Sequence, residues 1–247
     1  MNSKINGIVL KTKPLGDYDL ILTIFSKELG KIEAVAKGAR RSKNAPLYAQ
    51  PFAYSDFSVF KGRSSLYSID NSEVKEAFYN LRNDIVNLCL GQYFLEIVDF
   101  QTKSTITGDE QEILKLLLNS LFLLCQKEKT NSLIIKIVFE LKYAALNGFG
   151  PDFERCINCG ENPAVKWVFG KGVYCKKCKK DIGGAEINEA IQKIILHILN
   201  NEGISVYSFR TDDKLLEYLS EVTGSYLGYV LDMEFKTLNY YKTISKE

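Results

Sequence analysis

Four cysteines are arranged in two pairs whose spacing suits a metal ion. Cys156 and Cys159 form one C-x2-C pair, and after 15 intervening residues Cys175 and Cys178 form a second. Each pair places two sulfurs on the same side of a tight turn, so two pairs can complete a tetrahedron of thiolates. This spacing predicts a Zn²⁺ ion held by all four cysteines. Redox-active thiols and an iron–sulfur cluster are the alternatives for the same residues.

Four thiolate ligands leave no coordination position for water or substrate, so the predicted zinc is structural rather than hydrolytic. We expect residues 167–169 and 173–174, which lie between the pairs, to form a short hairpin. Four lysines flank the second pair, namely Lys176, Lys177, Lys179 and Lys180. These lysines either offset the negative charge of the thiolates or contact a nucleic acid or an acidic peptide.

The remaining residues do not form a recognisable catalytic set. The single histidine, His197, lies in an amphipathic helical pattern without a nucleophile motif, and we interpret it as a surface or hydrogen-bonded histidine. The sequence contains neither a G-x-x-x-x-G-K-[ST] loop nor a G-x-G-x-x-G turn that opens a helix. Cys89 and Cys125 lie in apolar helical stretches and are expected to be buried and inert. The sequence therefore predicts a protein that is not an enzyme, with a zinc-dependent enzyme as a third alternative.

A basic loop is the second group of candidate functional residues. It carries four cations between two predicted strands: Lys37, Arg40, Arg41 and Lys43. Such loops border the binding face of OB-type barrels, where cations contact phosphates and aromatic rings stack on bases. The candidate DNA-binding residues are these four with Lys11, Lys13, Lys61 and Arg63. A solvated turn without a ligand is the alternative interpretation.

The nearby aromatic residues give a weaker signal. The candidate platforms for a base are Tyr18, Tyr48, Phe52, Tyr54, Phe57, Phe60 and Tyr67. Most of them alternate with polar residues in the predicted strands, as core side chains do. Only Tyr48, which lies in the basic loop, is singled out as a platform for a base.

Composition narrows the class of protein. The chain has 247 residues, 46% of them hydrophobic and 25% charged, and a formal net charge of +2, as in ordinary globular proteins. Residues 1–63 carry 11 Lys and Arg against 5 Asp and Glu, so positive charge is concentrated at the start. No apolar run is long enough for a membrane span, and no signal-peptide pattern follows Met1. We expect a cytoplasmic protein, in which six cysteines indicate metal binding rather than disulfides.

The first 78 residues are predicted to form five short strands. Period-2 patterning and turn residues divide them into segments 5–13, 18–26, 32–37, 52–61 and 66–78. Five strands in so short a segment favour a closed barrel, because closure removes exposed strand edges. We expect an OB-fold barrel, with an SH3-like barrel as the alternative.

From about residue 81 the apolar period becomes helical. Helical patterns cover residues 81–100, 113–124, 134–145, 187–198 and 215–230, and helices this apolar are expected to form a bundle. The sequence thus predicts a multidomain α+β protein. Its expected parts are an OB-fold domain (1–78), a helical domain in two pieces (79–150 and 186–247) and an inserted four-cysteine zinc ribbon (151–185).

Several segments of the chain resemble the RecO family of bacterial DNA repair proteins. They are residues 7–10 (GIVL), 16–26 (GDYDLILTIFS), 30–32 (GKI), 36–41 (AKGARR), 148–151 (GFGP), 226–229 (YLGY) and 234–238 (EFKTL). The likeness covers most of the chain and is most specific in residues 7–41. Asp17 departs from it, because the family more often has glutamate there. The family varies in keeping its zinc cysteines, and this chain keeps all four.

The resemblance implies an N-terminal OB-fold, a helical domain and a zinc ribbon. It also implies a DNA-binding mediator of DNA recombination and DNA damage repair in the RecF pathway, cytoplasmic and associated with the nucleoid. Proteins of this family bind single- and double-stranded DNA, promote strand annealing, and act with RecR and RecF to load RecA onto strands covered by single-strand-binding protein. They also contact the C-terminal tail of that protein. The alternative function is a non-catalytic protein-interaction scaffold with a structural zinc ribbon.

Overall fold

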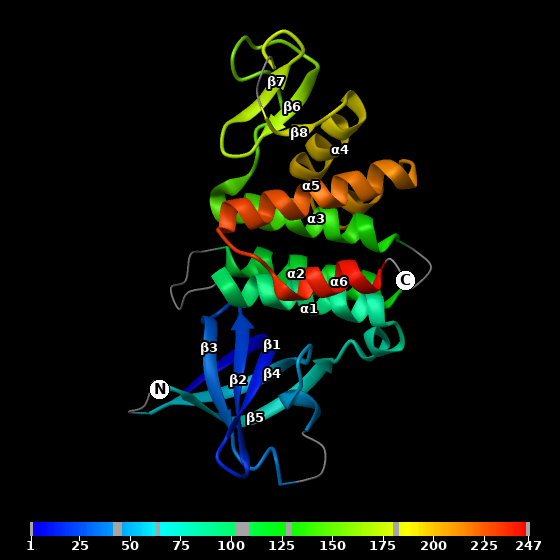
Figure 1. Cartoon of the computed structure of the whole chain (residues 1–247). Helices are drawn as coiled ribbons and strands as arrows, with labels where there is room; N and C mark the ends of the chain where they lie inside the picture. Colours follow the sequence, from blue (N-terminus) through cyan, green and yellow to red (C-terminus); the bar gives the residue numbers. More distant parts are fainter. Residues whose placement is uncertain are drawn as a thin grey trace. The chain divides into compact units, whose positions relative to one another are not determined.

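A computed structural model of the chain describes residues 2–41, 46–62, 65–101, 109–126, 130–179 and 183–245. The chain divides into two compact units, coloured along the sequence in Figure 1. The first unit comprises Met1–Cys125 with Phe235–Glu247, and the second comprises Gln126–Glu234.

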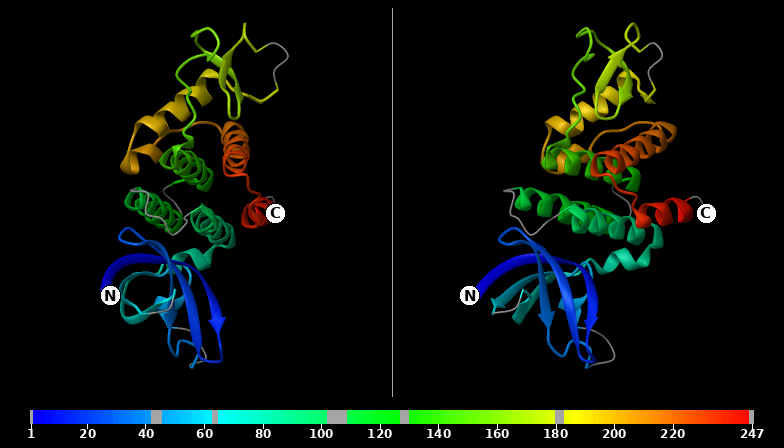
Figure 2. Two further views of the ribbon diagram at one scale, coloured as in Figure 1. Left: turned by 90° about the vertical axis from the view of Figure 1, so that its left-hand side faces the viewer. Right: turned by 60° about the vertical axis from the view of Figure 1, so that its left-hand side comes forward.

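The first unit contains a closed five-stranded barrel, as the sequence predicts. Its strands are β1 (Asn2–Leu15), β2 (Asp19–Ser26), β3 (Gly30–Ala36), β4 (Tyr54–Lys61) and β5 (Tyr67–Glu76). They follow one another around the barrel in the order β1-β2-β3-β5-β4. The long strand β1 closes the ring, because its first half pairs with β4 and its second half pairs with β2 (Figure 2). The fold class is thus an OB-like barrel joined to helices.

Alternation of side chains builds the barrel core. In β3, Ile32, Ala34 and Ala36 are buried, whereas the residues between them are only partly covered. Strand β2 is buried along nearly its whole length, because α1 and α2 pack against its outer face while its other side fills the barrel. This cover leaves the outward side chains of β1 and β3 as the accessible part of that face.

Three α-helices complete the first unit: α1 (Ile85–Gln101), α2 (Glu110–Cys125) and α6 (Lys236–Ile244), with the 3-10 turns η1 (Leu47–Ala49) and η2 (Tyr79–Asn83). Helix α6, which the sequence patterns did not indicate, packs on α1. The backbone N–H of Thr237 donates to the carboxylate of Glu96 at 3.1 Å, and Phe235 meets Tyr93 edge-on at 5.4 Å between ring centroids. These contacts join the end of the chain to its first half.

The second unit is built on α3 (Ser132–Ala144), α4 (Glu189–Asn200) and α5 (Asp213–Leu231), with η3 (Ala145–Phe149) and η4 (Gly203–Tyr207). Each α-helix begins at a side chain that accepts a hydrogen bond from the first turn: Asn131, Asn188 and Asp212 respectively. Helices α3 and α5 pack together along their apolar faces. Among the described residues, none of the helices combines the length and apolar character that a membrane crossing requires.

Between α3 and α4 the chain forms a small three-stranded sheet. It consists of β6 (Ala164–Val168), β7 (Gly172–Cys175) and β8 (Ala185–Glu186) in the order β7-β6-β8. Strands β6 and β7 are the hairpin expected between the two cysteine pairs, and β8 adds an edge strand that the sequence did not indicate.

Candidate metal centre and nucleic-acid interface

The four cysteines converge at the end of this small sheet. The sulfurs of Cys156, Cys159, Cys175 and Cys178 all lie within 4.8 Å of one another, and the Cys159 and Cys175 sulfurs are 3.5 Å apart. A tetrahedron with a Zn–S distance of about 2.3 Å has edges of about 3.8 Å. A disulfide would require a separation of about 2 Å. The sulfur positions therefore fit a metal ion with four thiolate ligands.

Backbone hydrogen bonds shape each cysteine pair into a turn. The N–H of Gly160 donates to the carbonyl of Cys156 at 2.8 Å, and the N–H of Cys178 donates to the carbonyl of Cys175 at 3.1 Å. Burial opposes ionisation of Cys156, but backbone N–H groups of the two pairs outweigh it and lower its pKa to about 6. A backbone N–H also favours the thiolate of Cys159, yet the neighbouring thiols prevail and raise its pKa to about 12. A cation bound to the four sulfurs would favour the thiolate form of each cysteine.

A buried aromatic side chain anchors the sheet to helix α5. Trp167 is 1% exposed, and its ring centroid lies 4.7 Å from that of Phe153 and 4.5 Å from that of Tyr226 on α5. On the other side, the buried amide of Gln192 on α4 donates to the carbonyl of Phe153 at 2.7 Å and accepts from the N–H of Ala164 at 3.3 Å. These contacts hold the cysteine segment against its own unit.

The lysines near the second pair differ in their surroundings. Lys179 lies 3.5 Å from the carboxylate of Glu186, which Lys166 approaches to 2.6 Å. Lys176 and Lys177 are exposed. Lys180 lies outside the described residues.

Other groups that could do chemistry lie apart from the cysteine cluster. The ring nitrogens of His197 are within 3.2 Å of the Ser205 carbonyl and 3.3 Å of the Asn201 amide, so this histidine is held by its own helix and the turn that follows. Cys89 is buried and Cys125 half-buried, and burial raises the pKa of both thiols, that of Cys125 to about 11. Both thiols are therefore protonated and unreactive at neutral pH.

The basic loop folds back onto the turn between β1 and β2. The N–H of Gly38 donates to the Asp19 carboxylate at 2.7 Å. The N–H of Arg40 donates to the Tyr18 carbonyl at 2.8 Å, and the Arg40 guanidinium donates to the Gly16 carbonyl at 2.8 Å. Ala39, between them, is 1% exposed and belongs to the barrel core. The loop is thus an anchored part of the barrel.

These contacts bring together four exposed side chains, Tyr18, Lys37, Arg40 and Arg41, which we term the rim cluster. The guanidinium of Arg41 lies over the Tyr18 ring, 5.7 Å from its centroid. Asp17 in the same turn is also exposed and opposes part of the positive charge. Lys43 lies outside the described residues.

Lys11 and Lys61 line a groove of about 420 Å³ elsewhere on the barrel, which we term the lysine groove. Lys31, Tyr67, Asp99 and Phe100 also line it. The ammonium group of Lys11 forms an ion pair with Asp99, and that of Lys31 lies 3.5 Å from the same carboxylate. The Lys61 ammonium nitrogen lies over the Tyr67 ring, 5.0 Å from the ring centroid.

The rim cluster and the lysine groove are linked along β1. Lys13 lies between them and pairs with Glu33 at 2.7 Å. From Lys11 to Leu15 the strand rises about 13 Å. The structure thus divides the predicted cations between the loop after β3, which carries Lys37, Arg40 and Arg41, and the groove that Lys11 of β1 and Lys61 of β4 line. Arg63 lies outside the described residues.

Sequence reasoning missed two residues of this region, Lys31 and Asp99, and misplaced a third. The sequence pattern puts Tyr18, one of seven aromatic candidates, in a strand, but β2 begins at Asp19 and Tyr18 belongs to the preceding turn. Tyr48, singled out instead, is half-buried against the barrel core. Asp99 and Lys31 meet across 68 residues of sequence, and no local pattern could have paired them.

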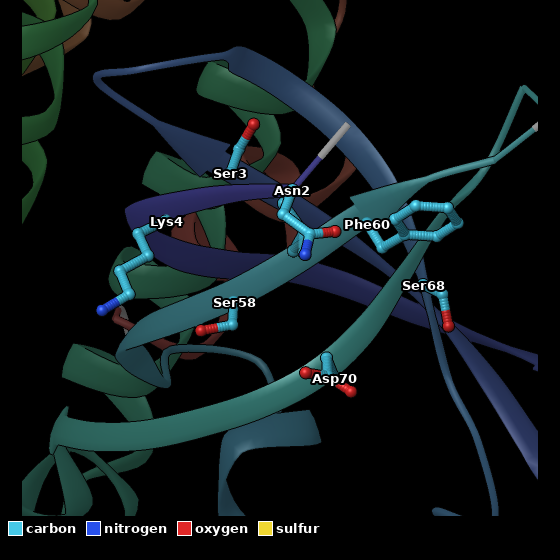
Figure 3. A pocket seen from close by; sticks show the side chains of 8 residues that line it. Asn2, Ser3, Lys4, Ser58, Phe60, Ser68 and Asp70 are labelled. Carbon is cyan, nitrogen blue, oxygen red and sulfur yellow. The ribbon is translucent and has the colours of Figure 1, made fainter.

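A further hollow of about 660 Å³ lies over the ends of β1, β4 and β5 (Figure 3). Lys4 stands at one end and Phe60 at the other, with Asp70 and three serines among its lining residues. Among its described lining residues the charges of Lys4 and Asp70 balance, and none is a predicted site residue. The described residues of this hollow therefore offer no positive excess for a polyanion.

Comparison with known proteins finds two matching family models, described as recombination protein O N terminal (residues 1–78) and recombination protein O C terminal (residues 82–239). The chain is similar to the DNA repair protein RecO of Alkaliphilus metalliredigens, with 36% identity over 98% of this chain and 99% of that protein. It is also similar to the DNA repair protein RecO of Acetivibrio thermocellus, with 33% identity over 98% of this chain and 97% of that protein.

Proposed function

Because the chain belongs to the RecO family of DNA repair proteins, we propose that it binds single- and double-stranded DNA through the rim cluster and the lysine groove. The observation that carries this proposal is the anchored loop, which presents Lys37, Arg40 and Arg41 beside an exposed tyrosine. Fixed cations lose little freedom when they bind phosphates, and each phosphate contact releases counterions from the DNA.

The activity we propose is that of a recombination mediator. Bound to two complementary strands, the protein would screen their phosphates and speed annealing. With RecR and RecF it would help to load RecA onto strands covered by single-strand-binding protein, and it would contact the C-terminal tail of that protein. The proposed mediator is not an enzyme and acts in the cytoplasm of a bacterium, at the nucleoid.

We propose zinc as the metal of the four-cysteine cluster. Thiolate ligands in a closed tetrahedral set are typical of structural zinc, which contributes free energy of folding to small segments. Cys156, Cys159, Cys175 and Cys178 would hold the ion and so join the two turns at the end of the β6–β7 hairpin.

A salt series tests the DNA-binding proposal. The Arg40→Ala/Arg41→Ala variant should bind a single-stranded oligonucleotide more weakly, and the slope of log affinity against log salt should become shallower by about 1 to 2 units. The matched control is Arg210→Ala/Lys214→Ala, which removes two exposed cations at the start of α5. An unchanged affinity and slope in the Arg40/Arg41 variant would remove the rim cluster from the DNA site.

An annealing assay tests the mediator role itself. Complementary strands should anneal faster with the native protein than alone, and the Arg40→Ala/Arg41→Ala variant should lose most of this acceleration. DNA binding without any acceleration of annealing would argue against the mediator activity.

A further inference from the structure

We propose that Tyr18 and Arg41 form a subsite for one unpaired base, which rests on the DNA binding proposed for the rim cluster. The Tyr18 ring is 58% exposed and that of Phe60 on β4 is 47% exposed, whereas Phe25 and Phe57 of the barrel core are at most 1% exposed. A single exposed ring on a protein surface is common. Tyr18 combines this exposure with a cation on its ring and with a place beside Lys37 and Arg40 in the rim cluster.

The position of Arg41 depends on the shape of the loop. Gly38 has φ +67°, and a Cβ built at this position would lie 3.3 Å from the Cδ of Arg41. The aliphatic part of Arg41 therefore passes directly over the Gly38 backbone, which directs its guanidinium to the Tyr18 ring. Tyr18 is fixed in turn, because its carbonyl accepts the N–H of Arg40 at 2.8 Å. Ring and guanidinium are thus held together before a ligand arrives.

A planar ring beside a planar guanidinium is suited to a nucleobase. Bases of single strands stack on aromatic side chains and on guanidinium planes, and the interaction tolerates every base because each has a π-face. Lys37 and Arg40 lie in the same cluster and can contact the phosphates on either side of the stacked base. In a duplex the bases are stacked on one another, so only the phosphate contacts remain. The subsite therefore gives the rim cluster its preference for unpaired strands.

Three probes of equal length separate stacking from charge: a thymidine oligonucleotide, an abasic oligonucleotide with the same phosphates, and a duplex. Tyr18→Ala should weaken binding of the thymidine strand by about 5- to 150-fold, the range for one stacked base. Its binding of the abasic strand and of the duplex should not change. The salt slope should also stay the same, because Tyr18 neutralises no phosphate. Tyr18→Phe, which keeps the ring, should retain the affinity of the native protein.

Tyr79→Ala is the matched control, because Tyr79 is also 58% exposed and has the Arg82 guanidinium 4.8 Å from its ring centroid, yet belongs to neither cluster. Equal losses of Tyr18→Ala on the thymidine and abasic strands would overturn the subsite, since the ring would then act only by shaping the loop. Unchanged binding in Tyr18→Ala together with a loss in Arg40→Ala/Arg41→Ala would overturn the subsite alone. Unchanged binding in both variants would overturn the proposed DNA site and the subsite with it.

Discussion

Replacing Asp99 with asparagine should strengthen DNA binding, because the Asp99 carboxylate competes with phosphates for two lysines. Lys11 and Lys31 both pair with this carboxylate in the lysine groove. A phosphate that enters the groove must displace Asp99 from them. Asparagine keeps the size of the side chain and removes the charge. The Lys11 ammonium group then loses its ion pair, whereas that of Lys31 keeps the hydrogen bond that it donates to the backbone carbonyl of residue 99.

The structure sets the size of the effect. If both lysines each gain a phosphate of a single strand, the slope of log affinity against log salt steepens by about 1.4, and affinity at 0.1 M salt rises about 25-fold. Exposed ion pairs contribute only about 0.2 to 1 kcal/mol each, and the Lys11 side chain is 57% exposed. The expected gain therefore lies between about 2-fold and 25-fold.

Fluorescence anisotropy with a labelled single strand over a salt series measures both quantities. The control is Glu112→Gln, which releases Lys115 from an exposed pair of 2.9 Å on α2, outside the rim cluster and the lysine groove. This control should leave affinity and slope as they are. If Asp99→Asn also leaves both unchanged while its thermal unfolding stays native-like, the lysine groove does not contact DNA and the reasoning is refuted.

Three further predictions concern other parts of the chain. Asp19→Ala removes the acceptor of the Gly38 N–H, so the less ordered loop should bind DNA about 2- to 10-fold more weakly. Removal of a negative charge alone would strengthen binding, so tighter binding would contradict the anchoring role of Asp19. Chelation of the metal, or Cys175→Ser, should speed hydrogen exchange in residues 150–179 while the barrel keeps its protection. Metal affinity should fall as the pH falls, because protons compete with the metal for the thiolates. Equal exchange with and without metal would exclude a structural ion. Lys136→Met removes the ammonium group that lies 2.8 Å from the buried Glu140 carboxylate. The free energy of unfolding, measured in a urea titration, should fall by about 3 to 5 kcal/mol. A loss below about 1 kcal/mol would show that water reaches this pair.

Local patterns in the sequence were sufficient for the barrel strands, for the helices other than α6 and for the cysteine cluster. Period-2 alternation predicts the five strands of the barrel, because side chains on successive residues of a strand point to opposite faces. The spacing of Cys156, Cys159, Cys175 and Cys178 predicts that their sulfurs converge, because a hairpin between the two C-x2-C pairs brings their turns side by side. Both inferences use interactions between residues close in sequence.

The amino-acid sequence by itself therefore determined the barrel, the helices and the cysteine cluster, whereas only the tertiary structure decided which cations act together. Lys11 and Asp99 meet across 88 residues, and Tyr18 lies beside Arg41 because hydrogen bonds from Gly38 and Arg40 anchor the loop. Helix α6 likewise gains its place from contacts with α1, more than a hundred residues earlier. The physical reason is common to these cases. Ion pairs, ring contacts and helix packing depend on distances between residues that are remote in sequence, and the tertiary fold determines these distances.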